Sequence, residues 1–546
     1  MAAPQFTRRA LFCSVQAAAL AAALVAAFAA SPARAAGFDP AKVQPEAPGV
    51  AARLPDPPVR YDTPGFEPGQ TGFTSYARLT RFVEDLAAQS PNVQLESAGV
   101  SQEGRNLHLL TLAQGRRINP ALPTVLMVAT QHGNEPAPAE AALVLAQQLA
   151  ANPDGILSRI NVLLVPLANP DGYERFQRAT ASGLDMNRDH LLLRTPEAAA
   201  LAGIARRYAP QVVLDLHEFT VGGRWVDKFG VVQKNDALLQ SASVGNLDPA
   251  LRAFAENQVL APALAALDRA GLTAAPYHTA SDDAQDKVVS MGGVQPDTGR
   301  NVYGLRNSVS ILLETRGVGI GRAHFLRRVY TQVTLARSVL DSAARQSSAL
   351  LAAVAAAGRS ATASACTGDL VVSATHTPQP RDLVYLDATT GADRTLSLDW
   401  RAADPLKVLA TRPRPCGYVL SADQTLAAQT LQRLGVTVQR VLQPAEVAGE
   451  RYRITAEDEG QRQDARGAIA ASQAIRKLKV ALEPGTQSVP AGSYYVPLAQ
   501  PMSGLVSAAL EPDSQNSYVA NRLIPLDTTA PDSLRRLTRP LTSGLR

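Results

Sequence analysis

The sequence contains little cysteine and almost no net charge for its 546 residues. Three cysteines, far apart along the chain, exclude a zinc site built from cysteine thiolates. The net charge is +5, and three of the positive side chains lie in the first 35 residues, which contain no acid. The remaining chain is close to neutral, so its basic pI does not indicate nucleic-acid binding, which requires Lys and Arg clustered on one face.

Long hydrophobic runs are also missing, with one exception at the N-terminus. Thr7-Arg8-Arg9 precedes an apolar stretch from Ala17 to Ala30, and Ala33-Arg34-Ala35 follows it. A basic start, a short apolar core and an Ala-x-Ala end are typical of a secretory signal peptide, with cleavage expected after Ala35. The alternative is a retained membrane anchor, but this stretch is shorter than the roughly 20 residues of a spanning helix. The paired arginines leave Sec and twin-arginine export both open, so we expect a periplasmic or secreted protein.

Two cysteines remain after removal of a signal peptide that contains Cys13. They are Cys366 and Cys416. In an oxidising compartment such a pair predicts a disulfide, and the alternative is two unpaired buried thiols.

Changes in composition divide the chain into five predicted segments, consistent with two domains for this length. Alternation of apolar strand-like runs with helix-like stretches predicts an α/β catalytic domain with a mixed, largely parallel sheet flanked by helices. A further mixed region predicts a C-terminal α/β or α+β accessory domain with a loose tail after Thr528. The segments are a signal peptide (1–35), an extended Pro-rich lead-in (36–70), the catalytic domain (71–345), a helix end and linker (346–365), and the accessory domain (366–546).

Four short apolar runs in the predicted catalytic domain are each followed by a polar cluster. Runs of this kind are typical of strands buried on both faces of a sheet. In open α/β sheets, ligands bind beyond the carboxyl ends of the strands, so we expect the four clusters to share one edge. The runs are Thr124–Thr130, Ile160–Pro166, Gln211–Leu216 and Ser308–Leu313.

The clusters after the first and third runs contain metal-ligand side chains. His132 and Glu135 are three residues apart after the first run, and His217 follows the third. Two histidines and one glutamate match a catalytic zinc site, which keeps its fourth position for water. The alternative is a set of buried, hydrogen-bonded polar residues.

The second and fourth runs are followed by residues suited to binding and proton transfer. Arg178 and Arg188 follow the second run. An arginine side chain can bind a carboxylate through two parallel hydrogen bonds. Glu314 directly follows the fourth run. Burying a carboxylate there costs free energy unless it pairs with a positive group or takes part in a reaction. Beside zinc-bound water it would act as general base. The alternative for Glu314 is an ion pair with Arg316 or Arg322.

In these motifs, over residues 75–340, the sequence resembles the zinc metallocarboxypeptidase family of the carboxypeptidase A type. The resemblance implies one zinc ion per chain on His132, Glu135 and His217. It also implies that Glu314 is the general base and that Arg178 polarises the scissile carbonyl group, with Arg175 as its competitor. The remaining matches are Asp185-x-Asn187-Arg188, which holds the substrate's terminal carboxylate through Asn187 and Arg188, and Ser101–Arg105, which matches the family's first hairpin.

Two features of this resemblance leave alternatives open. Asp185 is expected to orient a zinc histidine, or else to cap a turn, and Arg188 has the alternative of an ion pair with Asp185 or Asp189. The family usually has a mobile tyrosine just before a Gly-Gly pair that precedes the general base. Residues 288–293 end in Gly-Gly but contain no tyrosine, and the nearest substitutes are Tyr277 and Tyr303.

The sequence therefore predicts an exported zinc carboxypeptidase that hydrolyses peptides with a free C-terminal carboxylate. We expect no nucleic-acid partner and no membrane span after signal cleavage. A related zinc deacylase of N-acyl amino acids, similar to aspartoacylase, is the first alternative, because such enzymes share the His-Gly-Asn-Glu sequence at 132–135. A non-enzymatic protein that binds peptide ends is the second.

Overall fold

The computed structural model describes Met1 and residues 37–546, except residues 44 and 470. Apart from Met1, the predicted signal peptide with Cys13 lies outside the described residues. No helix within the described residues is both long enough and apolar enough to cross a membrane.

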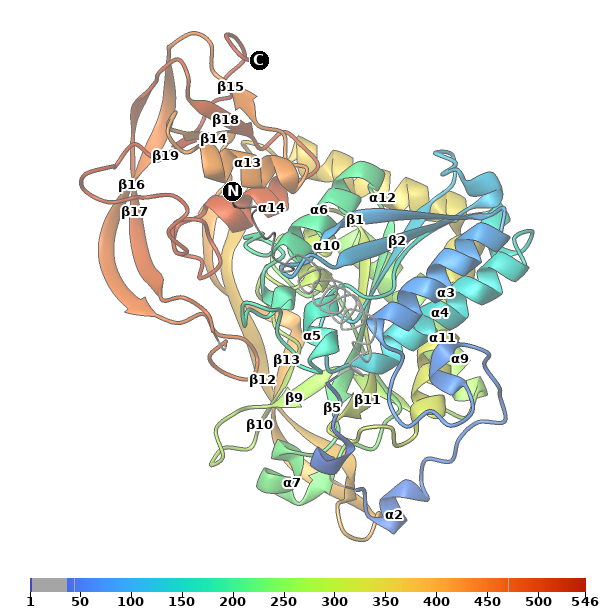
Figure 1. Cartoon of the computed structure of the whole chain (residues 1–546). Helices are drawn as coiled ribbons and strands as arrows, with labels where there is room; N and C mark the ends of the chain where they lie inside the picture. Colours follow the sequence, from blue (N-terminus) through green and yellow to red (C-terminus); the bar gives the residue numbers. More distant parts are fainter. Residues whose placement is uncertain (2–36, 44, 470) are drawn as a thin grey trace.

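An eight-stranded mixed sheet forms the centre of the first domain (Figure 1). The four predicted runs are its adjacent, mutually parallel middle strands β4, β3, β5 and β11. Every residue of β3 and β4 is buried, as expected for strands covered on both faces. The strand order is β1 (Val93–Val100), β2 (Asn106–Leu112), β4 (Asn161–Val165), β3 (Thr124–Ala129), β5 (Val212–Thr220), β11 (Val309–Val318), β7 (Ala237–Ser241) and β8 (Ala274–Pro276).

Helices cover both faces of this sheet, which confirms the predicted fold class. Alternate side chains of β3 point to opposite faces, so Val125 and Met127 join one core while Leu126 and Val128 join another. The first core contains α3 (Tyr76–Gln89), α4 (Pro136–Ala151), α9 (Ala261–Arg269) and α11 (Phe325–Arg345), and the second contains α6 (Pro196–Tyr208) and α10 (Gly299–Leu305).

Shorter elements connect these layers. The hairpin β1–β2 turns at residues 101–105, where the sequence predicted it. A second long helix, α12 (Ser347–Ala363), follows α11 and takes up most of the expected helix end and linker at 346–365. The remaining helices of the first domain include α2 (Pro48–Ala51), α5 (Pro170–Glu174), α7 (Arg224–Phe229), α8 (Pro249–Phe254), the short 3₁₀ turn η5 (Met186–Arg188) and the π-helix η6 (Ala255–Leu260).

A long β-hairpin after α12 joins the two domains (Figure 1). Its strands pair with β6 on one side and with β10 on the other, so segments from both sides of the expected linker share one sheet. Cys366 and Cys416, just outside the two ends of this hairpin, form the predicted disulfide. The sheet order is β6 (Val231–Val232), β12 (Asp369–Asp387), β13 (Asp393–Pro413), β10 (Val288–Met291) and β9 (His278–Ala280).

The C-terminal domain contains a third sheet of six strands. The tail after Thr528, expected to be loose, contributes β19, which lies between β14 and β16. Burial of Leu534 and Leu537 explains why this segment is fixed. The order is β15 (Gln439–Arg440), β18 (Tyr494–Pro497), β14 (Gly417–Leu420), β19 (Leu534–Leu537), β16 (Ala445–Gly460) and β17 (Ile475–Val489), with helices α13 (Thr425–Arg433) and α14 (Ser503–Leu510).

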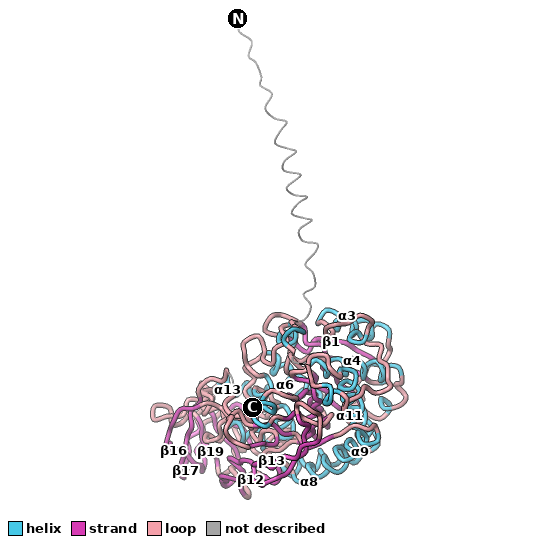
Figure 2. Tube along the Cα trace, turned by 90° about the horizontal axis from the view of Figure 1, so that it is seen from below, coloured by secondary structure: helices cyan, strands magenta, loops and turns pink. Residues whose placement is uncertain are grey.

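The two domains are packed through a common hydrophobic core. Side chains of α6 and α10 in the first domain belong to the same buried cluster as those of α13 and α14 in the second. Figure 2 shows the β16–β17 ribbon at the far side of the molecule from α11 and α9. The C-terminal domain therefore lies against the helical layer formed by α6 and α10.

Candidate active site

The polar clusters that follow the four middle strands meet at one edge of the sheet, as predicted. His132 and Glu135 lie in the connection from β3 to α4, and His217 and Glu314 lie on β5 and β11. His217 and Glu314 are register partners in the parallel pair β5–β11, so the two side chains stand next to each other. All four residues are buried.

Three of these side chains converge on one point. The Nδ1 atoms of His132 and His217 face each other at 3.1 Å. Glu135 lies against both, with Oε1 2.7 Å from Nδ1 of His132 and Oε2 2.9 Å from Nδ1 of His217. Two imidazole nitrogens directed at each other and at one carboxylate form a donor set that a metal ion satisfies. The ligand atoms lie within 4.8 Å of one another, and two histidines with one glutamate suit zinc.

The far ring nitrogen of each histidine faces a carboxylate. Nε2 of His132 is 3.1 Å from Oδ1 of Asp185, and Nε2 of His217 is 2.7 Å from Oδ1 of Asp215. Such contacts fix the tautomer that leaves Nδ1 free to bind metal. Sequence reasoning missed Asp215, although a signal existed: residues i and i+2 of a strand lie on the same face, so Asp-Leu-His on β5 places the acid beside its histidine.

Asp185 fulfils both of the roles considered for it. Besides facing His132, it accepts a hydrogen bond of 2.9 Å from the backbone N–H of Asn187 and so caps the turn η5. Its other oxygen accepts from Nε and Nη2 of Arg178 at 3.1 and 2.8 Å. Although burial opposes its charged form, Arg178 and His132 hold the pKa of Asp185 well below its usual range.

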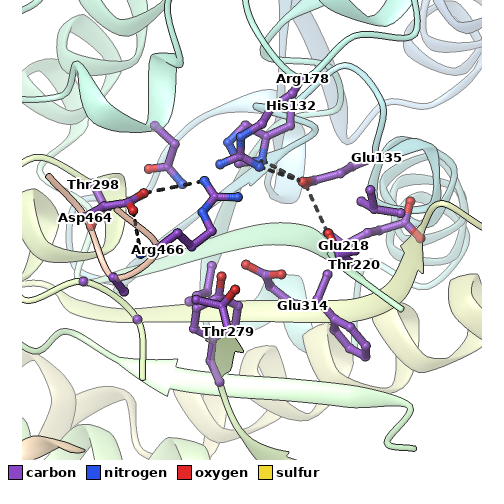
Figure 3. A pocket seen from close by; sticks show the side chains of 18 of the residues that line it. His132, Glu135, Arg178, Glu218, Thr220, Thr279, Thr298, Glu314, Asp464 and Arg466 are labelled. Carbon is purple, nitrogen blue, oxygen red and sulfur yellow. Dashed lines mark hydrogen bonds and ion pairs between the residues drawn. The ribbon is translucent and has the colours of Figure 1, made fainter. Parts of the chain in front are cut away.

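Arg178, rather than Arg175, enters the pocket (Figure 3). Asp185 holds two of its three guanidinium nitrogens. This leaves Nη1 directed at His132, Glu135 and His217, which we call the candidate ligand set. Nη1 lies 3.2 Å from Nδ1 of His132 and 3.6 Å from Oε1 of Glu135. Arg175 instead pairs with Glu103.

Glu314 is a buried carboxylate without an ion pair to any described residue. Arg316, one of its two proposed partners, pairs with Glu46, and the other, Arg322, donates to the backbone carbonyl groups of Gly65 and Gly72. Burial raises the pKa of Glu314 to about 8, because it disfavours the charged carboxylate. Glu314 is only 7% exposed, but its side chain lines the pocket.

The turn that carries His132 depends on Gly133. A Cβ atom at this position would lie 2.0 Å from the carbonyl carbon of Gly172, in α5. The connection after β3 therefore passes against the backbone of α5 at a distance that only glycine permits.

We expect Gly133→Ala to lower the free energy of unfolding by about 1–3 kcal/mol or more and to reduce metal binding, because the turn must move. Gly203→Ala, in α6, is the matched control. A Cβ atom there meets nothing within 4 Å, so its effect should stay below about 1 kcal/mol and be stabilising. Thermal unfolding and bound-metal analysis measure both effects, and equal behaviour of the two variants would contradict this role of Gly133.

The two residues predicted to hold a substrate carboxylate line the pocket, but both have partners within the chain. The Asn187 side-chain amide lies 3.2 Å from Nε2 of His217, and its oxygen accepts from the backbone N–H of Gly299. Arg188 forms an ion pair of 2.6 Å with Asp464, and not with Asp185 or Asp189.

Asp464 belongs to residues 461–469, which we call the pocket loop. This loop is the first part of the connection between β16 and β17 of the C-terminal domain. Its residues Asp464, Ala465 and Arg466 line the pocket (Figure 3). Sequence reasoning missed these residues, because no motif marks them and Asp464 is 276 positions from Arg188.

Of the two tyrosines considered as substitutes for a mobile tyrosine, only Tyr277 lines the pocket. Tyr303 lies on α10 against the ring of His190, in the core behind the site. Nε2 of His190 donates a hydrogen bond to Oε1 of Gln131. The other described histidines outside the ligand set also contact ordinary polar partners. Those histidines are His108, His278, His324 and His376.

Comparisons with known proteins show which proteins this chain is similar to. A sequence model of the zinc carboxypeptidase family matches residues 79–212. "Carboxypeptidase 2" of Trichophyton rubrum is 28% identical over 475 residues, which cover 85% of this chain and 86% of that protein. "Carboxypeptidase D" of Homo sapiens is 30% identical over 134 residues, or 21% of this chain and 10% of that protein. A solved metallo-carboxypeptidase from Burkholderia cenocepacia aligns over 50% of this chain and 70% of its own, with 18% identity and a TM-score of 0.38.

The matched region includes His132, Glu135 and the segment with Arg178, Asn187 and Arg188. His217 and Glu314 lie beyond that region, and the fold brings them to the same edge of the sheet. The alignment with the Trichophyton relative covers 85% of this chain, which is more than the catalytic domain contains. The similarity therefore extends into the C-terminal domain. The chain thus contains a region similar to the zinc carboxypeptidase family, at residues 79–212, and is a peptidase.

Proposed function

We propose that this protein is an exported zinc-dependent carboxypeptidase that removes C-terminal residues from peptides. The observation that carries the proposal is the buried carboxylate of Glu314, which no described residue pairs with, beside a convergent His132–Glu135–His217 set. A metal-activated hydrolase needs both parts: ligands that leave one position open for water, and a base next to that position.

One zinc ion would be held by Nδ1 of His132, Nδ1 of His217 and the Glu135 carboxylate. When bound, zinc supplies a Lewis acid that polarises a carbonyl group and lowers the pKa of water. Asp185 and Asp215 orient the two histidines through their Nε2 atoms, at 3.1 and 2.7 Å.

The chain's own groups then perform proton transfer and charge stabilisation. Glu314 accepts a proton from the attacking water and delivers it to the leaving amine nitrogen, as its side-by-side position with His217 allows. Nη1 of Arg178 donates a hydrogen bond to the scissile carbonyl oxygen, where negative charge develops. Asp185 keeps that guanidinium in place through Nε and Nη2.

The substrate's terminal carboxylate binds at the end of the pocket that Asn187 and Arg188 line. Tyr277, also in the pocket, is our candidate for the family's mobile tyrosine. Export is supported by the predicted signal peptide and by the Cys366–Cys416 disulfide, because structural disulfides persist in oxidising compartments.

A comparison of substrates tests this function against the deacylase alternative. We expect the zinc-loaded protein to cleave peptides of three or more residues with kcat/KM far above that for N-acyl amino acids. Amidation of the peptide C-terminus should lower kcat/KM by at least about tenfold, because a charge-assisted hydrogen bond is lost. Faster turnover of N-acyl amino acids than of any peptide would contradict the proposal.

A further inference from the structure

Hydrogen bonds and an ion pair attach the pocket loop to the catalytic domain beside the active site. Arg462 donates through Nη2 to the backbone oxygen of Arg188 at 2.6 Å and to Oδ2 of Asp297 at 2.9 Å. The backbone oxygen of Arg466 accepts from the N–H of Asp282 at 2.8 Å. With the Asp464–Arg188 ion pair, three separate attachments hold this segment of the C-terminal domain against the catalytic domain.

The loop binds one side of the Arg188 guanidinium group through Asp464. Asp464 Oδ2 accepts from Nε and Nη2 of Arg188 at 3.2 and 2.6 Å, and Nη1 donates to the backbone oxygen of Asn187 at 2.8 Å. Each of the three guanidinium nitrogens therefore has a partner, and the side chain is only 13% exposed. Although Asp464 is largely buried, Arg188 and Arg466 hold its pKa below its usual range, so this acid stays charged.

Arg466 differs from Arg188 in having a guanidinium that is largely free. Its nearest acid is Asp464, at 3.5 Å, and that carboxylate already serves Arg188. Its side chain is 26% exposed and reaches from the loop into the pocket (Figure 3). Arg178 lies close enough to disfavour a second positive charge, and this like-charge proximity lowers the pKa of Arg466. An anion bound between them would remove that cost.

Resting on the function proposed above, we propose that Arg466, supplied by the C-terminal domain, binds the terminal carboxylate of the peptide substrate. Arg188 is then a positioning residue, which fixes the pocket loop through Asp464. The substrate's carboxylate would lie between Arg466 and Asn187, with the scissile carbonyl group toward Arg178 and the ligand set. The C-terminal domain is thus part of the binding site.

Binding in the zinc-loaded full-length Glu314→Gln variant tests this assignment without turnover. The probes are one peptide as its free acid and as its C-terminal amide, titrated by calorimetry. Adding Arg466→Ala should weaken binding of the free acid by about ten- to a hundredfold and leave the amide within about twofold. Arg466→Gln should match it, and Arg466→Lys should restore part of the acid preference. Melting temperature and zinc content show that each variant is folded and loaded.

Arg224→Ala is the matched control. Arg224 also lines the pocket but pairs with Asp282, so its loss should leave the acid preference unchanged. Asp464→Asn separates the proposal from a competing arrangement. In that arrangement Arg188 itself binds the substrate's carboxylate, and Asp464 competes with the substrate for Arg188. We expect Asp464→Asn to weaken binding of the free acid, because the loop loses one of its three attachments.

An unchanged acid preference in both Arg466→Ala and Arg466→Gln would overturn the proposal. Tighter binding of the free acid in Asp464→Asn, with no effect of Arg466→Ala, would assign the carboxylate to Arg188 instead. Failure of the wild-type protein to bind or cleave any peptide would reject the proposed function itself. The first two outcomes require peptide binding, so the two failures are distinguishable.

Discussion

Replacing Glu314 with Gln is expected to lower kcat for peptide hydrolysis by about 10²–10⁴-fold, the usual contribution of a general acid–base residue. Glutamine keeps the size of the side chain and its place on β11 but cannot accept the proton of the attacking water. Zinc content and peptide affinity should stay close to those of the wild type, because Glu314 is not part of the ligand set. Steady-state kinetics with metal analysis measure all three quantities.

Asp282→Asn is a suitable control for this variant. It also replaces a carboxylate near the pocket by its amide, but Asp282 is half-exposed and pairs with Arg224 at the pocket edge. Its kcat should remain within about twofold of the wild type, as for most surface substitutions. A Glu314→Gln protein that retained more than a tenth of the wild-type kcat would contradict the assigned role.

The second large effect concerns the metal. His217→Ala is expected to reduce bound zinc from one ion per chain to almost none and to abolish hydrolysis, because only two ligands remain. Zinc at a thousandfold its Kd should stabilise the wild-type protein by about 4 kcal/mol, and this stabilisation should vanish in the variant. Metal analysis and thermal unfolding with and without zinc test both statements.

His108→Ala provides the comparison for this experiment. His108 is also buried, but it lies on β2 and contacts Thr80 rather than the ligand set. This variant should keep its bound zinc and its stabilisation by zinc even if it unfolds at a lower temperature. Normal zinc binding by His217→Ala would show that the metal is held elsewhere.

The catalytic half of this structure could be predicted because short stretches of sequence indicate both its strands and the residues at the strand ends. Apolar runs such as Thr124–Thr130 indicate buried strands, and parallel strands deliver the residues that follow them to one edge. Once His132 and His217 are placed at such ends, their meeting follows from topology. The same reasoning extends to Asp215, whose position follows from strand periodicity.

The contribution of the C-terminal domain could not be predicted in this way. Asp464 meets Arg188 across 276 positions, through packing between domains that no local spacing encodes. The tail after Thr528 is polar at its start and resembles a loose end, yet Leu534 and Leu537 fill the core of the third sheet. In both cases long-range packing determines the structure, and single-sequence patterns carry little information about it.

The most direct test of the account is a time course of one unlabelled peptide with the zinc-loaded protein, followed by mass spectrometry, beside a sample treated with a chelator. We predict stepwise loss of residues from the C-terminus, none with the chelator, and recovery when zinc is added back. Internal cleavage, loss from the N-terminus, or hydrolysis that continues without metal would contradict a zinc carboxypeptidase.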